Sequence, residues 1–392
     1  QHQHVLKEKG LENKTGENNC FLNVVIQSLW HLKRFRSKFF EWTEHSCCDK
    51  EKQKEKDNEI TCVHCALTCI FSYYCSPDHS VITPKFLRQT LNNIFRSQER
   101  FQIGEIDDAT EALDSVLSCL HDSTRKEDGE ESCIPHKVFG IDSISMVTCI
   151  GCGIQSEPLP NLHFIEYIYS NDICESKKMH PEYSLEYIIK HSNKETRGCP
   201  EEDEKLACLN MKNPVKTLLL NVPEVITLGL VWTSTSPSVD EIEETLNIIQ
   251  PELELDELYE IVDIQKQKDK RYKFRGMICF YGRHYNAYFF NDSIEKWIIF
   301  DDATVKKVGS LWSDVLNRCK RGHHQPSVLF YELMDNSDLK AKPNSQPTHQ
   351  IESIPSPEIQ IQRPVIIRSP YFPLTSSLIN PSYTLDYFTR YL

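Results

Sequence analysis

The spacing of apolar side chains divides the chain into a helical first part and a β-rich second part. From residue 18 to about 120, apolar positions recur every three to four residues, which is typical of helices with one buried face. The predicted helices are 20–35, 65–74, 84–95 and 108–121. From residue 138, short alternating runs separated by turns predict strands of a largely antiparallel sheet. These strands are 138–149, 162–170, 215–223, 224–232, 272–282, 284–290, 296–302 and 326–333.

One helical segment interrupts the predicted strands. Residues 240–249 have helical spacing, and the acidic stretch 251–263 follows them. We interpret this interval as an insertion at the edge of the sheet. The order of elements indicates an α+β fold, and the residues after 334, rich in Pro, Ser, Gln and Asn, predict a flexible tail.

Composition narrows the class of protein. Apolar residues make up 39% of the 392 residues, which is enough for a large core, and 44 basic against 57 acidic side chains leave a net charge of −13. An acidic chain is a poor candidate for nucleic-acid binding. We see no apolar run long enough to span a membrane and no signal sequence, so we expect a cytoplasmic protein, with the nucleus as a second location. Sixteen cysteines, several in C-x-x-C pairs, are expected to be reduced, and some to bind metal.

Cys20 lies where a polar loop meets the first predicted helix. Residues 15–23 read TGENNCFLN, and Gly16, Asn18 and Asn19 are expected to supply the turn and the helix cap. The unpaired N–H groups of a first helical turn, together with the helix dipole, favour a negative charge. Cys20 is therefore a candidate thiolate nucleophile. A small buried structural cysteine is the alternative.

A hairpin far downstream offers a base for this thiol. If Phe290 pairs with Glu295 across the turn, the same register places His284 opposite Asp301, with Cβ atoms about 5 Å apart. Asp301 can then hold one ring nitrogen of His284 and leave the other for the thiol. A slip of one residue would move the two side chains to opposite faces and make Asp302 the rival. An ordinary strand histidine beside an exposed hairpin end is the alternative.

Several segments in the same order resemble the ubiquitin-specific proteases. GLENKTGENNCFLNVVIQSL is similar to the cysteine box of that family, G-L-x-N-x-G-N-T-C-[YF]-x-N-x-x-[LI]-Q. IDDATEALDSVL resembles the Q-Q-D-A-x-E-F-L segment, and HYNAYFF with KWIIFDDATVKKV resembles the histidine box, H-Y-x-x-Y…W-x-x-F-[DN]-D-x-x-V. The likeness to the family continues in NVPEVITLGLVW and HHQPSVLFYEL. The cysteine box is most similar to the branch of the family with a G-x-N-x-C-F-L-N box, which includes members classed as inactive.

The resemblance implies a papain-like α+β fold with a helical thumb, a β palm and β fingers. The implied parts are an extension at 1–9, a catalytic domain at 10–333 and a tail at 334–392, with the thumb at 10–135, mostly fingers and palm at 136–235, and palm at 260–333. The implied reaction is hydrolysis of the isopeptide bond after the C-terminal glycine of ubiquitin. Carried over by position, Cys20 is the nucleophile, His284 the general base and then acid, and Asp301 the orienting acid, with Asp302 close by.

Two features depart from the family pattern. The family uses an Asn a few residues before the cysteine to stabilise the oxyanion, and this position corresponds to Asn13, but two extra residues separate it from Cys20. Asn18 is the alternative donor. The loop before the base is normally longer and glycine-rich and closes over the ubiquitin tail, whereas here it is short, with Gly282 followed by Arg283. Substrate gripping is therefore an open question.

Two cysteine-rich segments predict structural zinc sites, since a C-x-x-C turn presents two sulfurs to one ion. The first candidate set, which has a counterpart in several relatives, is His45, Cys47, Cys62 and Cys65. The second, which resembles the family's finger knuckle, is Cys149, Cys152, Cys199 and Cys208. Its second pair is separated by eight residues, with Asp203 where the second sulfur is expected, so the site is either distorted or without metal. The other cysteines, Cys133 among them, are interpreted as buried or incidental.

The sequence therefore supports two functions. The first is a thiol isopeptidase that acts as a monomer on ubiquitin or polyubiquitin conjugates, without nucleic acid or membrane insertion. The second is a weak or inactive pseudo-protease that binds ubiquitin as a scaffold. Acidic side chains at Glu105, Asp107 or Glu111 are candidates to line the approach of ubiquitin's arginine-containing tail to Cys20, although acidic loops are more often merely solvated.

Overall fold

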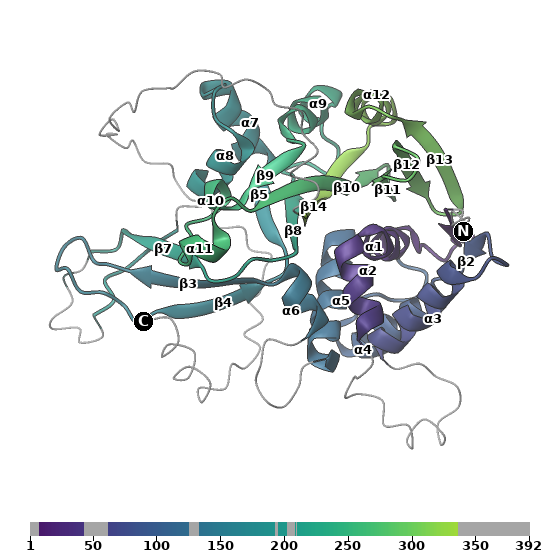
Figure 1. Ribbon diagram of the computed structural model, residues 1–392, viewed down its shortest axis with the longest axis horizontal. Coiled ribbons are helices and arrows are strands. Elements are labelled where there is room, and N and C mark those ends of the chain that lie inside the picture. Colours follow the sequence, from purple (N-terminus) through teal and green to yellow (C-terminus); the bar gives the residue numbers. More distant parts are fainter. Residues whose placement is uncertain are drawn as a thin grey trace, which may run out of the picture. The chain divides into compact units, whose positions relative to one another are not determined.

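The first part of the chain forms a cluster of helices. The computed structural model describes residues 8–42, 62–124, 133–192, 195–201, 208 and 210–335, all within one compact unit. The helices of this cluster are α1 (Cys20–His31), α2 (Lys33–Glu41), α3 (Val63–Cys75), α4 (Lys85–Ile94), α5 (Ala109–Thr124) and α6 (Ile134–Phe139) (Figure 1). Two short parallel strands, β1 (Gly10–Leu11) and β2 (Val81–Ile82), pair the segment before α1 with the segment between α3 and α4.

The single helix expected over 20–35 is wrong. Leu32 has extended backbone, with ψ at 104°, and separates α1 from α2. Apolar spacing did not reveal the break, because Leu32 and Phe35 are both fully buried and continue the same pattern. The other three predicted helices of this part correspond to α3, α4 and α5.

An eight-stranded sheet forms the centre of the second part. Its order is β13-β12-β11-β10-β14-β8-β5, with β9 paired to β10. The strands are β5 (Glu166–Tyr169), β8 (Val225–Val231), β9 (Glu252–Glu254), β10 (Arg271–Tyr281), β11 (His284–Asn291), β12 (Lys296–Asp301), β13 (Thr304–Gly309) and β14 (Gln325–Leu333). Only the β5–β8 pair in this sheet is parallel, which confirms a largely antiparallel arrangement for the described residues.

Helices cover both faces of this sheet (Figure 1). Side chains alternate along β12, so that Ile298 and Phe300 join the core shared with α1–α6, while Trp297 and Ile299 join a second core. The second part of the chain also contains six helices among its described residues. They are α7 (Ser170–Met179), α8 (Leu185–Ser192), α9 (Val239–Ile248), α10 (Leu255–Leu258), α11 (Ile264–Gln267) and α12 (Trp312–Gly322). The domain is therefore a helix–sheet–helix sandwich, and its largely antiparallel sheet, which follows a helical first part of the chain, is typical of an α+β fold.

The predicted insertion belongs to the core. Helix α9 begins at a capping box between Ser238 and Glu241 and buries Ile242 and Leu246 in the second core, while β9 pairs with β10. The interpretation of 240–263 as an insertion at the sheet edge is therefore incomplete. Helices α7 and α8 were not predicted.

A second, four-stranded sheet projects from the sandwich. Its order is β4-β3-β7-β6, with β3 (Ile141–Val147), β4 (Leu159–His163), β6 (Thr196–Arg197) and β7 (Asn213–Leu219). Much of this sheet is solvated, and its tip carries exposed Ile150 and Met211. Among the described residues, no helix is both long enough and apolar enough to cross a membrane, and the cysteines are all free thiols.

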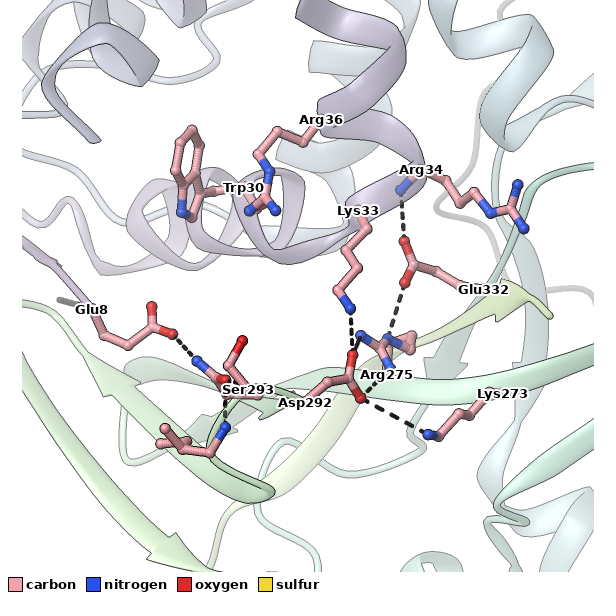
Figure 2. Close-up of polar contacts among 12 residues, drawn as sticks. Glu8, Trp30, Lys33, Arg34, Arg36, Lys273, Arg275, Asp292, Ser293 and Glu332 are labelled. Carbon is pink, nitrogen blue, oxygen red and sulfur yellow. Dashed lines mark hydrogen bonds and ion pairs between the residues drawn. The ribbon is translucent and has the colours of Figure 1, made fainter. Parts of the chain in front are cut away.

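A charge network ties the α1–α2 junction to the sheet (Figure 2). Arg275 on β10 forms ion pairs with Asp292 at 2.6 Å and Glu332 at 2.9 Å. Lys33 bonds the same Asp292, and the backbone N–H of Arg34 donates to Glu332. Although burial opposes ionisation, hydrogen bonds from Arg275 and Lys33 hold the pKa of Asp292 well below its usual range. The network joins the end of the helix that begins at Cys20 to the hairpin that carries His284.

Candidate active site

Cys20 is the first residue of α1 and is buried, with 2% of its surface exposed. The preceding turn uses left-handed backbone at Gly16 (φ 85°) and Asn18 (φ 51°). Asn19 occupies the N-cap position, but its side chain makes no capping hydrogen bond. The expected turn is confirmed and the expected side-chain cap is wrong. The N–H of Leu22 donates to the carbonyl of Asn19, and no N-cap side chain takes up the N–H groups at the start of α1.

The hairpin that carries His284 has a register two residues from the predicted one. Phe290 pairs with Trp297, not with Glu295, and Ala287 pairs with Phe300. Because side chains alternate with a period of two, this shift keeps His284 and Asp301 on the same face of the sheet, as diagonal neighbours. The predicted direct pairing is wrong, and the predicted contact is present.

Asp301 and Cys20 both influence the imidazole of His284. The Nε2 atom of His284 lies 2.8 Å from Asp301 Oδ1, and the Cys20 side chain is close enough to the ring to raise its pKa. The hydrogen bond to Asp301, followed by that to Cys20, raises the pKa of His284 to about 10. The bond from His284 in turn lowers the pKa of Asp301. At neutral pH the ring therefore carries a proton between a carboxylate and the sulfur.

Asp302 faces a different set of partners. Its carboxylate accepts hydrogen bonds from Asn13 at 2.8 Å and Asn23 at 2.7 Å, and its distance to His284 is 3.7 Å. Burial raises the pKa of Asp302, and the two amides oppose this rise. The two neighbouring acids thus have different contacts. Asp301 bonds the imidazole of His284, and Asp302 accepts a hydrogen bond from Asn13 in the loop before Cys20. The contact of Asn23 with Asp302 was not predicted, although Asn23 lies within the quoted cysteine box.

The two candidate oxyanion donors lie in different surroundings. The oxygen of Asn13 accepts the backbone N–H of Asn19 at 2.9 Å, and its amide nitrogen donates to Asp302, so the side chain is fixed beside the start of α1. Asn18 is more exposed and donates to the carbonyl of Gly104 at 2.7 Å. Each amide keeps a second N–H, but only that of Asn13 belongs to a side chain fixed at both ends.

The loop before His284 is a two-residue hairpin turn. Tyr281 pairs directly with His284, and the intervening Gly282 and Arg283 both have positive φ, at 52° and 68°. This combination is typical of the tight type I′ turn. The hydroxyl of Tyr281 donates to Asp301 at 3.3 Å, a contact that the sequence did not predict. The expected shortening is confirmed, and it leaves no loop that could fold over a substrate at this place.

Arginines hold two of the acidic side chains proposed to line the approach to Cys20. Arg88 lies 3.8 Å from Asp107, and Arg100 forms a 2.7 Å ion pair with Glu111. These carboxylates are therefore partly neutralised. A cavity of about 470 Å³ between α5 and the β4–β5 segment also has acids in its lining, Asp114 and Glu166, of which Glu166 is paired with His163 at 3.0 Å.

Four cysteines meet at the tip of the four-stranded sheet. The sulfurs of Cys149 and Cys208 are 3.1 Å apart, those of Cys152 and Cys199 are 3.6 Å apart, and all four lie within 4.8 Å of one another. The backbone N–H of Cys152 is the main reason why the pKa of Cys149 is lowered to about 6. Four converging sulfurs with a stabilised thiolate fit a tetrahedral zinc ion. The long spacing of the second pair therefore does not separate its sulfurs.

The other predicted metal set is only partly described. Cys62 precedes α3 and Cys65 lies in its first turn, whereas His45 and Cys47 lie outside the described residues. Asp203, which was considered for the site of Cys149, Cys152, Cys199 and Cys208, also lies outside them. This site stays a prediction.

The chain is similar to ubiquitin carboxyl-terminal hydrolases. Residues 9–331 match the family described as ubiquitin carboxyl-terminal hydrolase. Ubiquitin carboxyl-terminal hydrolase 54 of Rattus norvegicus is 33% identical over 353 residues, covering 86% of this chain and 21% of that protein. Ubiquitin carboxyl-terminal hydrolase 53 of Homo sapiens is 32% identical over 348 residues, covering 85% of this chain and 31% of that protein. The chain thus spans less than a third of the length of these relatives.

The fold also has a solved counterpart. A chain of the SAGA Ubp8/Sgf11/Sus1/Sgf73 DUB module bound to ubiquitin aldehyde has a TM-score of 0.54 and 16% identity, covering 84% of this chain and 70% of that one. Similarity at this level shows a shared fold, which agrees with the expected papain-like α+β architecture.

Proposed function

The chain belongs to the ubiquitin carboxyl-terminal hydrolase family, and on this premise we propose that it is a thiol-dependent deubiquitinase. It hydrolyses the isopeptide bond after the C-terminal glycine of ubiquitin in conjugates or chains. The observation that carries the proposal is the 2.8 Å bond of His284 to Asp301 together with the effect of Cys20 on the pKa of the same ring. Cys20 comes from the start of α1, and His284 and Asp301 come from the distant β11–β12 hairpin.

The arrangement supports a two-step reaction. The sulfur of Cys20 attacks the carbonyl carbon of the terminal glycine, and the proton held by His284 passes to the departing lysine amine. A thioester remains on Cys20. A water molecule then attacks this thioester, and His284 takes a proton from the water. The carbon–sulfur bond breaks, the ubiquitin carboxylate is released and Cys20 is restored. Asp301 keeps the ring oriented and stabilises its charge throughout.

We assign the oxyanion donor to Asn13. Asp302 and the backbone N–H of Asn19 fix its amide, and a preorganised donor stabilises developing charge more than a solvated one. Asn23, which donates to the same Asp302, is a positioning residue in this scheme. Asn18 serves the loop through Gly104.

The partner in this proposal is ubiquitin. The arginines of its tail are complementary to the acidic cavity that includes Asp114 and Glu166. We expect the enzyme to act as a monomer in the cytoplasm, with the nucleus as a second location.

Zinc has a structural role in this proposal. The cysteines at the tip of the four-stranded sheet, Cys149, Cys152, Cys199 and Cys208, would hold the ion, which would fix the fingers. A second zinc would bind His45, Cys47, Cys62 and Cys65.

The tight turn at Gly282 and Arg283 favours a second function. A protein that cannot close a loop over the ubiquitin tail can bind ubiquitin as a scaffold with little or no turnover.

A ubiquitin probe with a C-terminal electrophile separates the two functions. The deubiquitinase will form a covalent adduct that Cys20→Ala abolishes, while Cys75→Ala, at an exposed cysteine, keeps it. Saturable ubiquitin binding without an adduct would favour the scaffold. If the protein shows no ubiquitin binding and forms no adduct, both proposed functions are overturned.

A further inference from the structure

A second cluster of metal-ligating side chains lies away from Cys20 and from the four cysteines. It consists of His121 near the end of α5, Cys133 directly before α6, and His136 in the first turn of α6. One ligand atom from each residue lies within 4.8 Å of the other two. We propose that these three side chains bind a zinc ion that joins α5 to α6. The proposal is independent of the deubiquitinase activity.

The local fold of α6 presents two of the ligands together. Cys133 and His136 have C-x-x-H spacing, and Cys133 is the N-cap residue, with its sulfur accepting the backbone N–H of His136 at 3.3 Å. A donated N–H favours the thiolate form, which is the form that ligates metal. The cap therefore aims a buried sulfur and an imidazole to the same side of the helix start.

The third ligand comes from α5. The Nδ1 atom of His121 lies 2.9 Å from the sulfur of Cys133, and the rings of His121 and His136 are 6.0 Å apart. One sulfur and two imidazole nitrogens are a donor set that zinc prefers, and three protein ligands leave the fourth tetrahedral position to water. Such a site joins His121 to two ligands that follow it by twelve and fifteen positions in the sequence.

An outer carboxylate completes the pattern of a metal-binding histidine. The Nε2 atom of His136 lies 2.7 Å from Asp142 on β3, and both side chains are largely buried. The bond holds the ring with Nδ1 as its remaining nitrogen, as carboxylate–histidine–zinc sites do. Since β3 is a central strand of the four-stranded sheet, the ion would connect the helical cluster to that sheet at its root.

Metal analysis of the full chain tests the proposal. Cys133→Ser removes the sulfur but keeps an oxygen that caps α6, so the helix start is preserved. To remove the signal of the other cysteine cluster, the background carries Cys149→Ser and Cys152→Ser. In this background the Cys133→Ser chain will hold about one zinc ion fewer, whereas Cys174→Ser, at a half-buried thiol bonded to Thr245, will lose none.

Two further measurements separate a metal site from a Cys–His hydrogen bond. Cobalt loading of the background protein will give a thiolate-to-cobalt charge-transfer band that is weaker in Cys133→Ser by the contribution of one thiolate and unchanged in Cys174→Ser. Asp142→Asn keeps all three ligands, and competition with a chelator will show zinc bound about 10–100-fold more weakly. Zinc content and chelator competition unchanged in folded Cys133→Ser and Asp142→Asn would overturn the proposal. If Cys133→Ser does not fold, the result for Asp142→Asn decides.

Discussion

The ion pair between Arg275 on β10 and Glu332 on β14 allows a sharp test of the charge network beside the α1–α2 junction. Both side chains are nearly excluded from water, with 8% and 7% exposed, and the Nε–Oε2 distance is 2.9 Å. Arg275→Met removes the charged partner and leaves the carboxylate of Glu332 with the backbone N–H of Arg34 alone. Breaking a buried pair from one side costs about 3–5 kcal/mol.

This loss will be visible in thermal unfolding. At about 2 °C per kcal/mol, the low end of the usual range because the domain is large, the midpoint will fall by roughly 6–10 °C. Arg271→Met is the matched control, because Arg271 lies on the same strand and pairs with Glu254 at 2.8 Å, but both side chains are about 40% exposed. A surface pair contributes only about 0–1 kcal/mol. Equal shifts in the two variants would refute the reasoning.

The effect of Arg275→Met will also depend on pH. Burial raises the pKa of Glu332 above its usual value, and loss of Arg275, which opposes this rise, will raise it further. An acid whose pKa is higher in the folded state destabilises that state progressively as pH rises above the unfolded pKa of about 4.3. The variant will therefore lose less stability at about pH 5 than at about pH 7. Replacing both residues, Arg275→Met with Glu332→Leu, will recover part of the loss.

The active-site geometry leads to three other expected results. Asp301→Asn will lower the pKa of His284 from about 10 toward 6.5, measured by NMR of the ring, because the carboxylate is the largest cause of the rise; an unchanged pKa would contradict this. Asn13→Ala will reduce kcat by about 10²–10³-fold and Asn18→Ala far less, and equal losses would argue against the assigned donor. Arg283→Gly will stabilise the fold by about 0.5 kcal/mol in denaturant titration, since φ is 68°; destabilisation would show a contact that the turn needs.

The sequence predicted that His284 and Asp301 meet, but not the register that brings them together. The turn closes at Asn291 and Lys296, one position later in the sequence on each strand than the predicted pair of Phe290 and Glu295. The reason is partly local and partly tertiary. The oxygen of Asn291 accepts the N–H of Ser293, and Asp292 is drawn to Arg275 from the neighbouring strand. Because side chains alternate between the two faces of a sheet, a register shift of two residues leaves each side chain on the same face. The contact of His284 with Asp301 was therefore predicted in spite of the wrong register.

The same limit explains the other errors. Leu32 continues the helical pattern although its backbone is extended, because burial and backbone conformation are set by different neighbours. Cys133 was interpreted as incidental, since its partner His121 precedes it by twelve residues and the spacing has no recognisable motif. The spacing of Cys199 and Cys208 predicted a site that is either distorted or without metal, but the N–H of Cys199 bonds the carbonyl of Asn210, and the sulfurs converge with those of Cys149 and Cys152. Spacing identifies ligands only when the turn between them is local.

The short turn before His284 separates proton transfer from substrate binding. The turn makes the base rigid, because Tyr281 pairs with His284 on the ladder and also donates to Asp301. A rigid imidazole held by an ionised carboxylate is suited to catalysis whether or not a loop covers it. What the turn removes is contact area for the substrate tail. A low rate in this protein would therefore originate in weak ubiquitin binding, with a raised KM, rather than in the acid–base pair, and kcat at saturation would remain that of a competent thiol hydrolase.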